Sequence, residues 1–436
     1  MRRSVGLDFG TTNSAIAVVD DGAPPQLAAF RGGSDAHTFP SVLYFAPAGR
    51  GTARALHPET HAGHAAIEAY RAAEVKGRFI QSLKAYLAEP SFDGTAIGGR
   101  KYAVDDLVTI ILKHLRREVV DDLGELPPQV LVGRPVMFSN ARDAADNEVA
   151  LMRLRRALAT AGFAEVAFEY EPVAAAYAYE QRLQRDELIL IGDFGGGTSD
   201  FTIIGVGPGR ARRARVDDPV VGTEGVALAG DAFDKQIVRH LVAPRLGRGS
   251  QYLSPPDKFL DVPNWPYANL ERWHYLSFLK TPEAIDMLER IVGTALIPER
   301  IEAFLHLIRD DLGFEMHRAV QRAKFALSGQ EETVFEFRIH PVQIQQRITR
   351  QDFTGWIHEE LDAIRGCLDR LLTRTGTAPD QIDRVFLTGG SSFVPAVRQI
   401  FIDRFGAEKI TGGHELTSVA TGLALCAARE AQVVPA

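Results

Sequence analysis

Hydrophobic residues form short blocks along the chain, and these blocks alternate with stretches of helical periodicity. Residues 4–9 and 15–19 are apolar runs on either side of the turn GTTN, which is typical of two neighbouring strands. A further strand is expected at SVLYFAP, which begins at Ser41. Residues 104–124 place apolar side chains at helical spacing and end on Gly124, so this segment is predicted to be a helix.

The next segments continue to alternate between the two kinds of element. QVLVGRP is predicted to be a short buried strand, and ARDAADNEVALMRLRRALATAG a helix that closes at Gly162. AEVAFEYEP returns as a strand, and PVAAAYAYEQRL follows as a helix with Pro172 in its first turn. Strand pairs followed by alternating helices and strands predict an α/β layer structure.

The same order begins again near Asp186. ELILIGDF, SDFTIIGVG and RARVDDPVV are predicted to be three strands, and a helix is expected around DAFDKQIVRHLVAPRL. Later strands are predicted at ETVFEFRI and DRVFLTGG, with helices at 352–372, 394–405 and 415–430. Because this order repeats that of the first half, we expect a duplicated fold.

Residues 248–315 interrupt the second half. The first part of this segment is rich in proline and aromatic residues, including Trp265 and Trp273, and the rest has helical periodicity. We expect a small helical subdomain that uses these aromatic side chains for its own core. A surface for a partner protein is the alternative.

Composition limits the class of protein. At 436 residues the chain is too long for a single hydrophobic core, so two or three domains are expected. Its 49 basic and 56 acidic residues leave a net charge of −7, which attracts neither nucleic acid nor an anionic membrane. Cys367 and Cys426 are its only cysteines, which excludes a disulfide framework and a cysteine-rich zinc site. No window holds the roughly 18 to 20 apolar residues of a membrane helix, so we expect a soluble cytoplasmic protein.

Two acidic turns stand at equivalent places in the two halves. In GLDFGTTNS, Asp8 ends an apolar run and is followed by glycine and hydroxyl residues, and Asp193 does the same in GDFGGGTSD. Glycine lets the backbone approach a ligand closely, successive amides of such a turn bind anions, and a carboxylate can hold Mg²⁺ through water. The two turns are therefore predicted to clamp one polyphosphate. An ordinary hairpin stays the alternative for the first turn, whereas three consecutive glycines would weaken a purely structural second hairpin.

A third glycine turn, in FLTGGSSFVPAVRQIF, joins a predicted strand to a helix whose amino terminus would point at a ligand. Three turns of this kind favour a nucleotide over a simple anion. Asp-Phe-Gly also occurs in protein kinases, but the chain has no His-Arg-Asp loop and no Val-Ala-Ile-Lys strand. A Walker P-loop is absent from the sequence as well.

With these motifs the chain resembles the actin-like ATPase superfamily, and within it the nucleotide-binding domain of the DnaK-type 70-kDa heat-shock chaperones. The resemblance rests on GLDFGTTNS, YEPVAAAYAY, GDFGGGTSDFTI, AGDAFD, RAKFALS and VFLTGGSSFVPAVRQ, which follow one another in the family's order. The Pro/Trp-rich insert and KGRFIQSLKAYLAE are most similar to the YegD-type branch.

The resemblance implies an α/β fold of two ribonuclease H-like duplicated lobes with a nucleotide cleft between them. The first lobe would span 1–184 and be completed by a carboxyl-terminal helix at 415–430. The second would span 185–414 and include an inserted helical subdomain at about 230–330.

The resemblance also implies roles for individual residues. Asp8 and Asp193 would hold Mg²⁺ through its water shell. Lys84 matches the family lysine that reaches the γ-phosphate and orients the attacking water, Glu171 matches the acidic residue opposite it, and Thr198 would contact the γ-phosphate. The amides that would cradle the β- and γ-phosphates are those of Gly10, Thr11, Thr12, Asn13, Gly195, Gly196 and Gly197. The residues that would line the nucleoside and α-phosphate side are Gly230, Gly389, Gly390 and Ser391.

The adenine motif departs from the family pattern, which is usually Glu-x-x-Lys-Arg-x-x-Ser on one helix face. This chain has Gln321, Lys324, Phe325 and Ser328 at these positions. Phe325 would stack on a base where the arginine would have done so. Phe393 likewise stands where an arginine is usual in the third turn. ATP is the expected nucleotide, and the base preference stays open.

The resemblance implies an ATP-binding, slowly ATP-hydrolysing protein of the chaperone family, whose lobes close on Mg-ATP. The sequence shows no peptide-binding β-sandwich or helical lid, so we expect a protein partner or client to be met through another surface, with no nucleic acid or membrane involved. Two alternatives stay open. One is a small-molecule kinase of the same fold, for which no general-base motif is found, and the other is a non-catalytic nucleotide sensor or actin-like scaffold.

Overall fold

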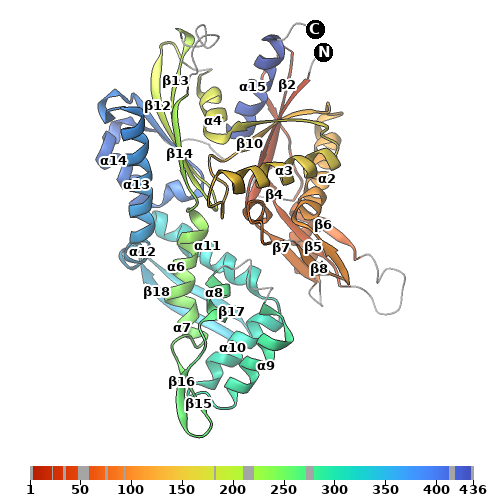
Figure 1. The fold of residues 1–436 in the computed structure, drawn as a ribbon, viewed down its shortest axis with the longest axis vertical. Coiled ribbons are helices and arrows are strands. Elements are labelled where there is room, and N and C mark those ends of the chain that lie inside the picture. The colour runs from red at the N-terminus through yellow and green to blue at the C-terminus, as the bar shows by residue number, and fades with distance from the viewer. Residues whose placement is uncertain are drawn as a thin grey trace. The chain divides into compact units, whose positions relative to one another are not determined.

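The computed structural model describes most of the chain, with short gaps. The described residues are 3–21, 23–32, 36–47, 58–73, 77–92, 94–180, 183–209, 220–271, 279–411 and 418–433. They form both helices and several sheets, as Figure 1 shows, which confirms the mixed α/β class. None of the described helices is long and apolar enough to cross a bilayer.

The chain divides into two compact units. Unit 1 comprises residues 1–229, 363–392 and 397–436, and unit 2 comprises residues 230–362 and 393–396. This division falls at 229/230 and not at 184/185, and the two-lobe organisation stays a prediction.

The first sheet of unit 1 has the order β11-β10-β1-β2-β3. These strands are β1 (Arg3–Phe9), β2 (Asn13–Asp20), β3 (Gln26–Leu27), β10 (Gln129–Arg134) and β11 (Glu165–Tyr170), and β4 (Phe39–Pro40) also pairs with β2. β1 runs antiparallel to β2 and parallel to β10, which is parallel to β11.

The second sheet of unit 1 repeats this arrangement with the order β14-β13-β12-β19-β20. Its strands are β12 (Glu187–Phe194), β13 (Ser199–Val206), β14 (Val220–Val226), β19 (Arg384–Thr388) and β20 (Ile410–Thr411). The first strand again pairs antiparallel with the second and parallel with the fourth. Asp8 and Asp193 are therefore the penultimate residues of corresponding strands.

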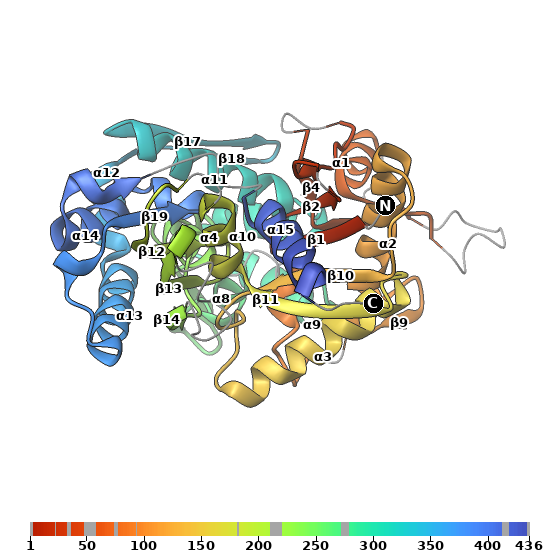
Figure 2. The ribbon, with the colours of Figure 1, turned by 90° about the horizontal axis from the view of Figure 1, so that it is seen from above.

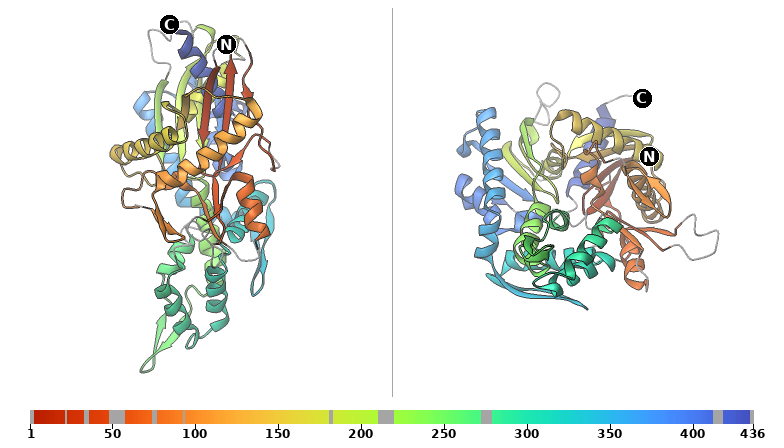
Figure 3. Two further views of the ribbon diagram at one scale, coloured as in Figure 1. Left: turned by 90° about the vertical axis from the view of Figure 1, so that its right-hand side faces the viewer. Right: turned by 60° about the horizontal axis from the view of Figure 1, so that its bottom comes forward.

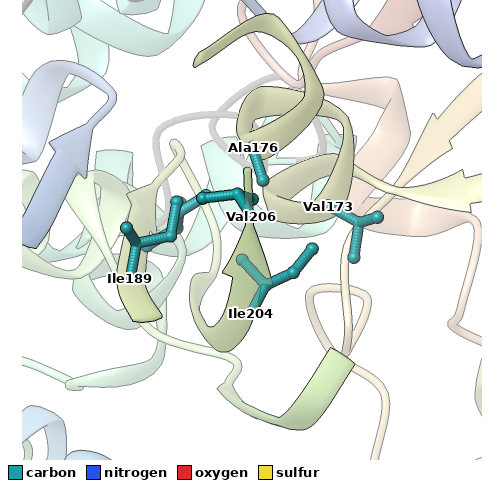
Figure 4. Close-up of a cluster of buried hydrophobic side chains, with 6 residues drawn as sticks. Val173, Ala176, Ile189, Ile204 and Val206 are labelled. Carbon is teal, nitrogen blue, oxygen red and sulfur yellow. The ribbon is translucent and has the colours of Figure 1, made fainter. Parts of the chain in front are cut away.

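Helices α4 (Glu171–Glu180) and α15 (Ser418–Val433) pack against each other, and each covers one of these two sheets. Figure 2 shows α15 beside β1 and β10. On the other sheet, Val173 and Ala176 of α4 join a buried apolar cluster with Ile189 (Figure 4). Full burial of an aliphatic side chain such as isoleucine contributes about 1.5 to 3 kcal/mol, so this face holds α4 in place.

Small residues allow α15 to lie close to its neighbours. Ala420 and Ala424 of α15 are fully buried against the first sheet. A Cβ atom at Gly6 would lie 2.5 Å from the carbonyl oxygen of Ala420, and one at Gly422 would overlap the carbonyl oxygen of Ala174 in α4. Glycine is therefore required at both crossings.

The segment between β4 and β11 supplies further elements of unit 1. The helices are α1 (Gly63–Ala72), α2 (Val104–Leu123) and α3 (Ala144–Thr160), and the short strands are β5 (Val42–Phe45), β6 (Thr60–Ala62), β7 (Arg78–Gln81), β8 (Thr95–Ile97) and β9 (Arg100–Tyr102). Asp143 caps α3, because its carboxylate accepts hydrogen bonds from the amides of Ala145 and Asp146. The helices predicted at 104–124 and within ARDAADNEVALMRLRRALATAG are thus present.

Two predictions for the second half of the chain need correction or fall outside the described residues. The single helix expected at 352–372 is two helices, α12 (Arg350–Trp356) and α13 (His358–Thr375), which separate at Ile357. Gly355 in the last turn of α12 weakens helix continuation there. Of the strand expected at RARVDDPVV, residues 213–219 lie outside the described residues, and α14 (Pro395–Phe405) follows the third glycine turn as predicted.

Unit 2 combines helices with two hairpins. The first helix, α6 (Gly230–Ile237), continues through a π-helical turn, η3 (Val238–Val242), into α7 (Ala243–Arg245). It is followed by α8 (Trp265–Glu271), α9 (Pro282–Val292), α10 (Pro298–Arg309) and α11 (Gly313–Gly329), and α12 also belongs to this unit. The hairpins are β15 (Gln251–Ser254) with β16 (Lys258–Asp261), and β17 (Glu332–Ile339) with β18 (Val342–Thr349). In Figure 3 the first hairpin, in green, lies at one end of the teal helices α9 and α10.

The insert is therefore not purely helical, and its aromatic residues do not all enter a core. Trp265 is 47% exposed, whereas Tyr267 is fully buried beside Phe304. Trp273 lies outside the described residues.

Candidate functional site

The first glycine turn joins β1 to β2 and is separated from Asp8 by Phe9. A side chain at Gly10 would overlap the carbonyl oxygen of Asn13, so the tight backbone requires glycine. The amide of Ser41 donates to the carbonyl oxygen of Thr12 at 2.8 Å, which fixes the turn from outside. Thr11 lies between Gly10 and Thr12 in the same turn.

The second turn joins β12 to β13 and is separated from Asp193 by Phe194. The amide of Gly195 donates to the carbonyl oxygen of Thr198 at 2.9 Å and closes the turn. A side chain at Gly197 would overlap the hydroxyl of Ser139, which shows that the segment after β10 lies against the turn. Gly196 lies in the closed turn between them.

The third turn lies next to the second. Asp193 is in register with Thr388 of β19, and the Thr388 hydroxyl donates to Oδ1 of Asp193 at 2.7 Å. Gly389 follows with φ of +80°, and a side chain there would overlap the carbonyl oxygen of Phe194. Gly390 and Ser391 begin the short 3₁₀ turn that follows. The sheet thus brings two of the three glycine turns together.

Lys84 and Glu171 form a buried ion pair. Nζ of Lys84 lies 2.7 Å from Oε1 of Glu171, and the two side chains are only 9% and 10% exposed. Lys84 belongs to a 3₁₀ turn, η2 (Leu83–Tyr86), that follows Ser82 in left-handed conformation. Glu171 is the first residue of α4, where Pro172 fits and the helix dipole favours a carboxylate.

The turn that carries Lys84 is held by two polar side chains from elsewhere in unit 1. Nη1 of Arg153 on α3 donates to the carbonyl oxygens of Tyr86 at 3.2 Å and Leu87 at 3.0 Å. Nδ2 of Asn140 donates to the carbonyl oxygen of Ala85 at 3.0 Å. The position of the lysine therefore depends on contacts that are distant in sequence.

Burial and mutual repulsion shift the pKa values of the carboxylates. Burial, with repulsion from Glu171, raises the pKa of Asp8 to about 8 and that of Asp193 to about 6. Burial alone would lower the pKa of Lys84, but the carboxylates of Glu171 and Asp8 raise it above its ordinary value. These four groups therefore belong to one electrostatic cluster, in which acids outnumber the single ammonium.

Asp200 is a member of this cluster that the sequence did not identify. It lies directly opposite Asp193 in the β12–β13 pair, and burial raises its pKa well above the usual value. Its Oδ1 accepts the amides of Val136 at 2.9 Å and Met137 at 3.2 Å, which ties the segment after β10 to the second turn. In the sequence, Asp200 could have been noticed as an acidic residue at the start of the apolar strand SDFTIIGV.

Gly230 and the residues of the predicted adenine motif belong to unit 2, whereas Gly389, Gly390 and Ser391 belong to unit 1. Nζ of Lys324 lies 2.7 Å from Oδ1 of Asp234 and donates to the carbonyl oxygen of Gly230 at 3.2 Å. Phe325, on the same helix α11, is 77% exposed. Ser328 donates its hydroxyl to the carbonyl oxygen of Lys324. Gln321 lies one turn before Lys324 on α11.

A metal would be held here by few direct ligands. Over the described ranges no group of three or more His, Cys, Asp or Glu side chains could hold a metal ion. Asp8 and Asp193 nevertheless fit Mg²⁺ bound through water, because they offer hard oxygen donors and the cluster carries more negative charge than Lys84 balances.

The family model described as Hsp70 protein matches residues 4–246 and 310–432. The chain belongs to the Hsp70 family. Membership of the Hsp70 family implies the actin-like ATPase α/β fold, whereas the YegD-type branch stays a prediction. Residues 247–309 lie outside the Hsp70 match.

Among curated Hsp70 proteins, the chain is similar to the chaperone protein DnaK from two strains of Thermus thermophilus. It is 27% and 26% identical to these two proteins over 442 residues. The alignment covers 98% of this chain and 60% of either relative. The chain thus spans about 60% of the length of the relatives it matches.

Proposed function

We propose that this chain binds ATP with Mg²⁺ and hydrolyses it slowly, as a DnaK-like protein of the chaperone family. The observation that carries the proposal is the buried pair of Lys84 and Glu171, which shares one electrostatic cluster with Asp8 and Asp193. The two aspartates stand at matching positions of two sheets of the same order, each before a glycine turn. A phosphate chain accompanied by a cation suits such a set of groups.

In this proposal the backbone of the two turns binds the β- and γ-phosphates. The amides involved are those of residues 10–13 and 195–197. Asp8 and Asp193 hold Mg²⁺ through its water shell, and the metal supplies positive charge that offsets charge on the phosphate oxygens. The excess of buried acids over the single ammonium supports a cation at this place.

Lys84 and Glu171 act on the γ-phosphate and the attacking water. The ammonium of Lys84 stays protonated at neutral pH, because the neighbouring carboxylates raise its pKa. It therefore neutralises the γ-phosphate and orients the water, while Glu171 fixes its position and Thr198 contacts the γ-phosphate. Hydrolysis of this kind requires positioning and charge stabilisation and no covalent nucleophile.

The two sheets of one order support a pair of duplicated, ribonuclease H-like lobes that close on Mg-ATP and open on ADP. Such closure would present two states to a partner or client protein. The name of the similar relatives, chaperone protein DnaK, supports a role with client proteins. Gly230, Gln321, Lys324, Phe325, Ser328, Gly389, Gly390 and Ser391 are the residues assigned to the nucleoside and α-phosphate.

The proposal is tested by two measurements on the full chain. Calorimetric titration with ATP, ADP and GTP in the presence and absence of Mg²⁺ is expected to show Mg²⁺-dependent binding of ATP. Single-turnover assays are then expected to show slow release of phosphate. A chain that binds none of the three nucleotides would contradict the whole proposal, whereas binding without turnover would contradict only the catalytic part.

The second candidate is a non-catalytic nucleotide sensor or scaffold. It is motivated by two exposed aromatic residues, Phe325 and Phe393, at positions where arginine was expected. Tight binding of ATP without turnover, or nucleotide-dependent filaments, would favour this candidate.

A further inference from the structure

The hairpin of β15 and β16 is extended on one side by a short segment of the same unit. Leu253 of β15 donates its amide to the carbonyl oxygen of Thr294, and Leu296 donates its amide to the carbonyl oxygen of Gln251, both at 2.9 Å. Tyr252 forms an antiparallel bridge with Ala295. Residues 294–296 therefore cover one edge of the hairpin and leave the β16 edge as the outer one. All of these residues lie within 247–309, outside the Hsp70 match.

One face of this small sheet is apolar and exposed. Leu253 lies directly opposite Phe259 in the hairpin, and Gln251, which is bonded to Leu296, lies two residues from Leu253. Opposite and alternate residues share a face, so Leu253, Phe259 and Leu296 form one row. They are 37%, 52% and 58% exposed.

The size of this row indicates what it can bind. Its exposed apolar area is on the order of 300 Å², at the lower end of the largest patches on monomers, which are often functional. A stable dimer needs roughly 800 Å² from each partner. The row therefore fits a short segment of chain and is too small for a stable interface with a second copy.

The hydrogen bonds also fix which way the backbone of β16 points. Gln251 and Leu253 direct their backbone groups toward 294–296, so Tyr252 directs its groups toward Leu260 of β16. The alternating groups of Phe259 and Asp261 then point outward. No partner for these outward amides and carbonyls is found in the part of the chain that the structure describes. They form a free strand edge next to the apolar row.

The charges along this edge favour complementary charges in a partner strand, and Oδ1 of Asp261 also accepts a hydrogen bond from Nε2 of Gln251 at 2.9 Å. Lys258 and Asp261 lie at its two ends, with Phe259 and Leu260 between them. An antiparallel partner strand would place a basic residue opposite Asp261 and an acidic residue opposite Lys258. Its two central residues would be apolar, and the one opposite Phe259 would extend the exposed row.

We propose that the outer edge of β16 binds an extended polypeptide segment with the order basic, apolar, apolar, acidic. The segment adds to the hairpin as a further antiparallel strand. Main-chain hydrogen bonds to Phe259 and Asp261 provide affinity, and the side-chain pattern provides specificity. This site shares no residue with the three glycine turns, and its residues lie in the segment that the Hsp70 match leaves out.

The first test changes only the ligand. A fluorescein-labelled peptide of threonine, lysine, valine, isoleucine, glutamate and threonine is titrated with the full chain, and anisotropy is measured. Methylation of its lysine and isoleucine amides, which face β16, is expected to weaken binding at least about tenfold, because it removes main-chain hydrogen bonds. Methylation of the valine and glutamate amides, which face away, is the matched control and is expected to leave affinity nearly unchanged.

The second test exchanges charges on both molecules. The double variant Lys258→Glu with Asp261→Lys is expected to lose affinity for this peptide and to bind the peptide in which lysine and glutamate are exchanged. An unchanged melting temperature shows that the variant is folded. Absence of saturable binding, equal effects of the two methylations, or a charge exchange that does not restore binding would each overturn the proposal.

Discussion

Nζ of Lys84 lies 2.7 Å from Oε1 of Glu171, although 87 residues separate them in sequence. If Lys84 orients the attacking water, Lys84→Ala is expected to lower the single-turnover rate of ATP hydrolysis by roughly 10², the scale of losing one positioned catalytic group. Lys113→Ala changes an exposed lysine of α2 and serves as the control. Equal rates for the Lys84 variant and the wild type would remove the catalytic role from this lysine.

The raised pKa of Asp8, about 8, predicts a pH-dependent stability of the protein without metal. In the unfolded protein, the pKa of an aspartate is about 3.9. Because the pKa of Asp8 is higher in the folded protein, protonation of Asp8 favours the folded state. The contribution of Asp8 to the free energy of unfolding is therefore fully present below about pH 4 and is lost as the pH rises through about 8. In EDTA, the melting temperature is therefore expected to be lower at pH 8.5 than at pH 6.5.

Asp8→Asn should reduce this pH dependence, because the amide does not ionise. The difference in melting temperature between pH 6.5 and pH 8.5 is measured for the variant, the wild type and Asp286→Asn, which changes an exposed aspartate of α9. If this difference is as large in Asp8→Asn as in the wild type, Asp8 does not cause the pH dependence.

Gly422→Ala is expected to destabilise the protein by about 2 kcal/mol or more, because the added methyl group meets the backbone of Ala174 in α4. Gly355→Ala is the matched control, since this helical glycine is exposed and its Cβ would meet no atom within 4 Å. The control is expected to raise stability by up to about 1 kcal/mol. Denaturant unfolding measures both, and equal effects would contradict the close helix crossing.

Phe325 offers a test of the base contact. If its exposed ring stacks on the base, Phe325→Ala is expected to weaken ATP binding roughly fivefold, since such stacking is worth about 1 kcal/mol. Binding of tripolyphosphate, which has no base, should not change. Val334→Ala removes another exposed apolar side chain of unit 2 and should leave ATP affinity unchanged. A variant that weakens ATP and tripolyphosphate equally would argue against stacking.

The local part of the site could be predicted from the sequence. The apolar runs around GTTN and GDFGGGTSD determine strand, turn and strand within about 20 residues, so β1, β2, β12 and β13 were found. Lys84 could not be found by periodicity, because it lies in a single 3₁₀ turn. Its position beside Glu171 depends on the long-range contacts that Arg153 and Asn140 make with that turn.

Three features of the structure were missed. Asp200 joins the site through the register of β12 with β13 and through the amide of Val136. The hairpin of β15 and β16 has strands of only four residues, too short for alternation to distinguish them from the surrounding helices. Helical periodicity likewise continued across Ile357, where the structure has two helices.

The position of α15 has a consequence for how the protein is made. This helix covers the face of the first sheet formed by β1, β2 and β10, yet it begins only at Ser418. During synthesis the ribosome releases the strands of that sheet long before their cover, at about 5 to 20 residues per second. The small apolar residues Ala15 and Ala17 of β2 therefore stay uncovered until α15 has been synthesised, and packing of the first sheet is completed only by this helix.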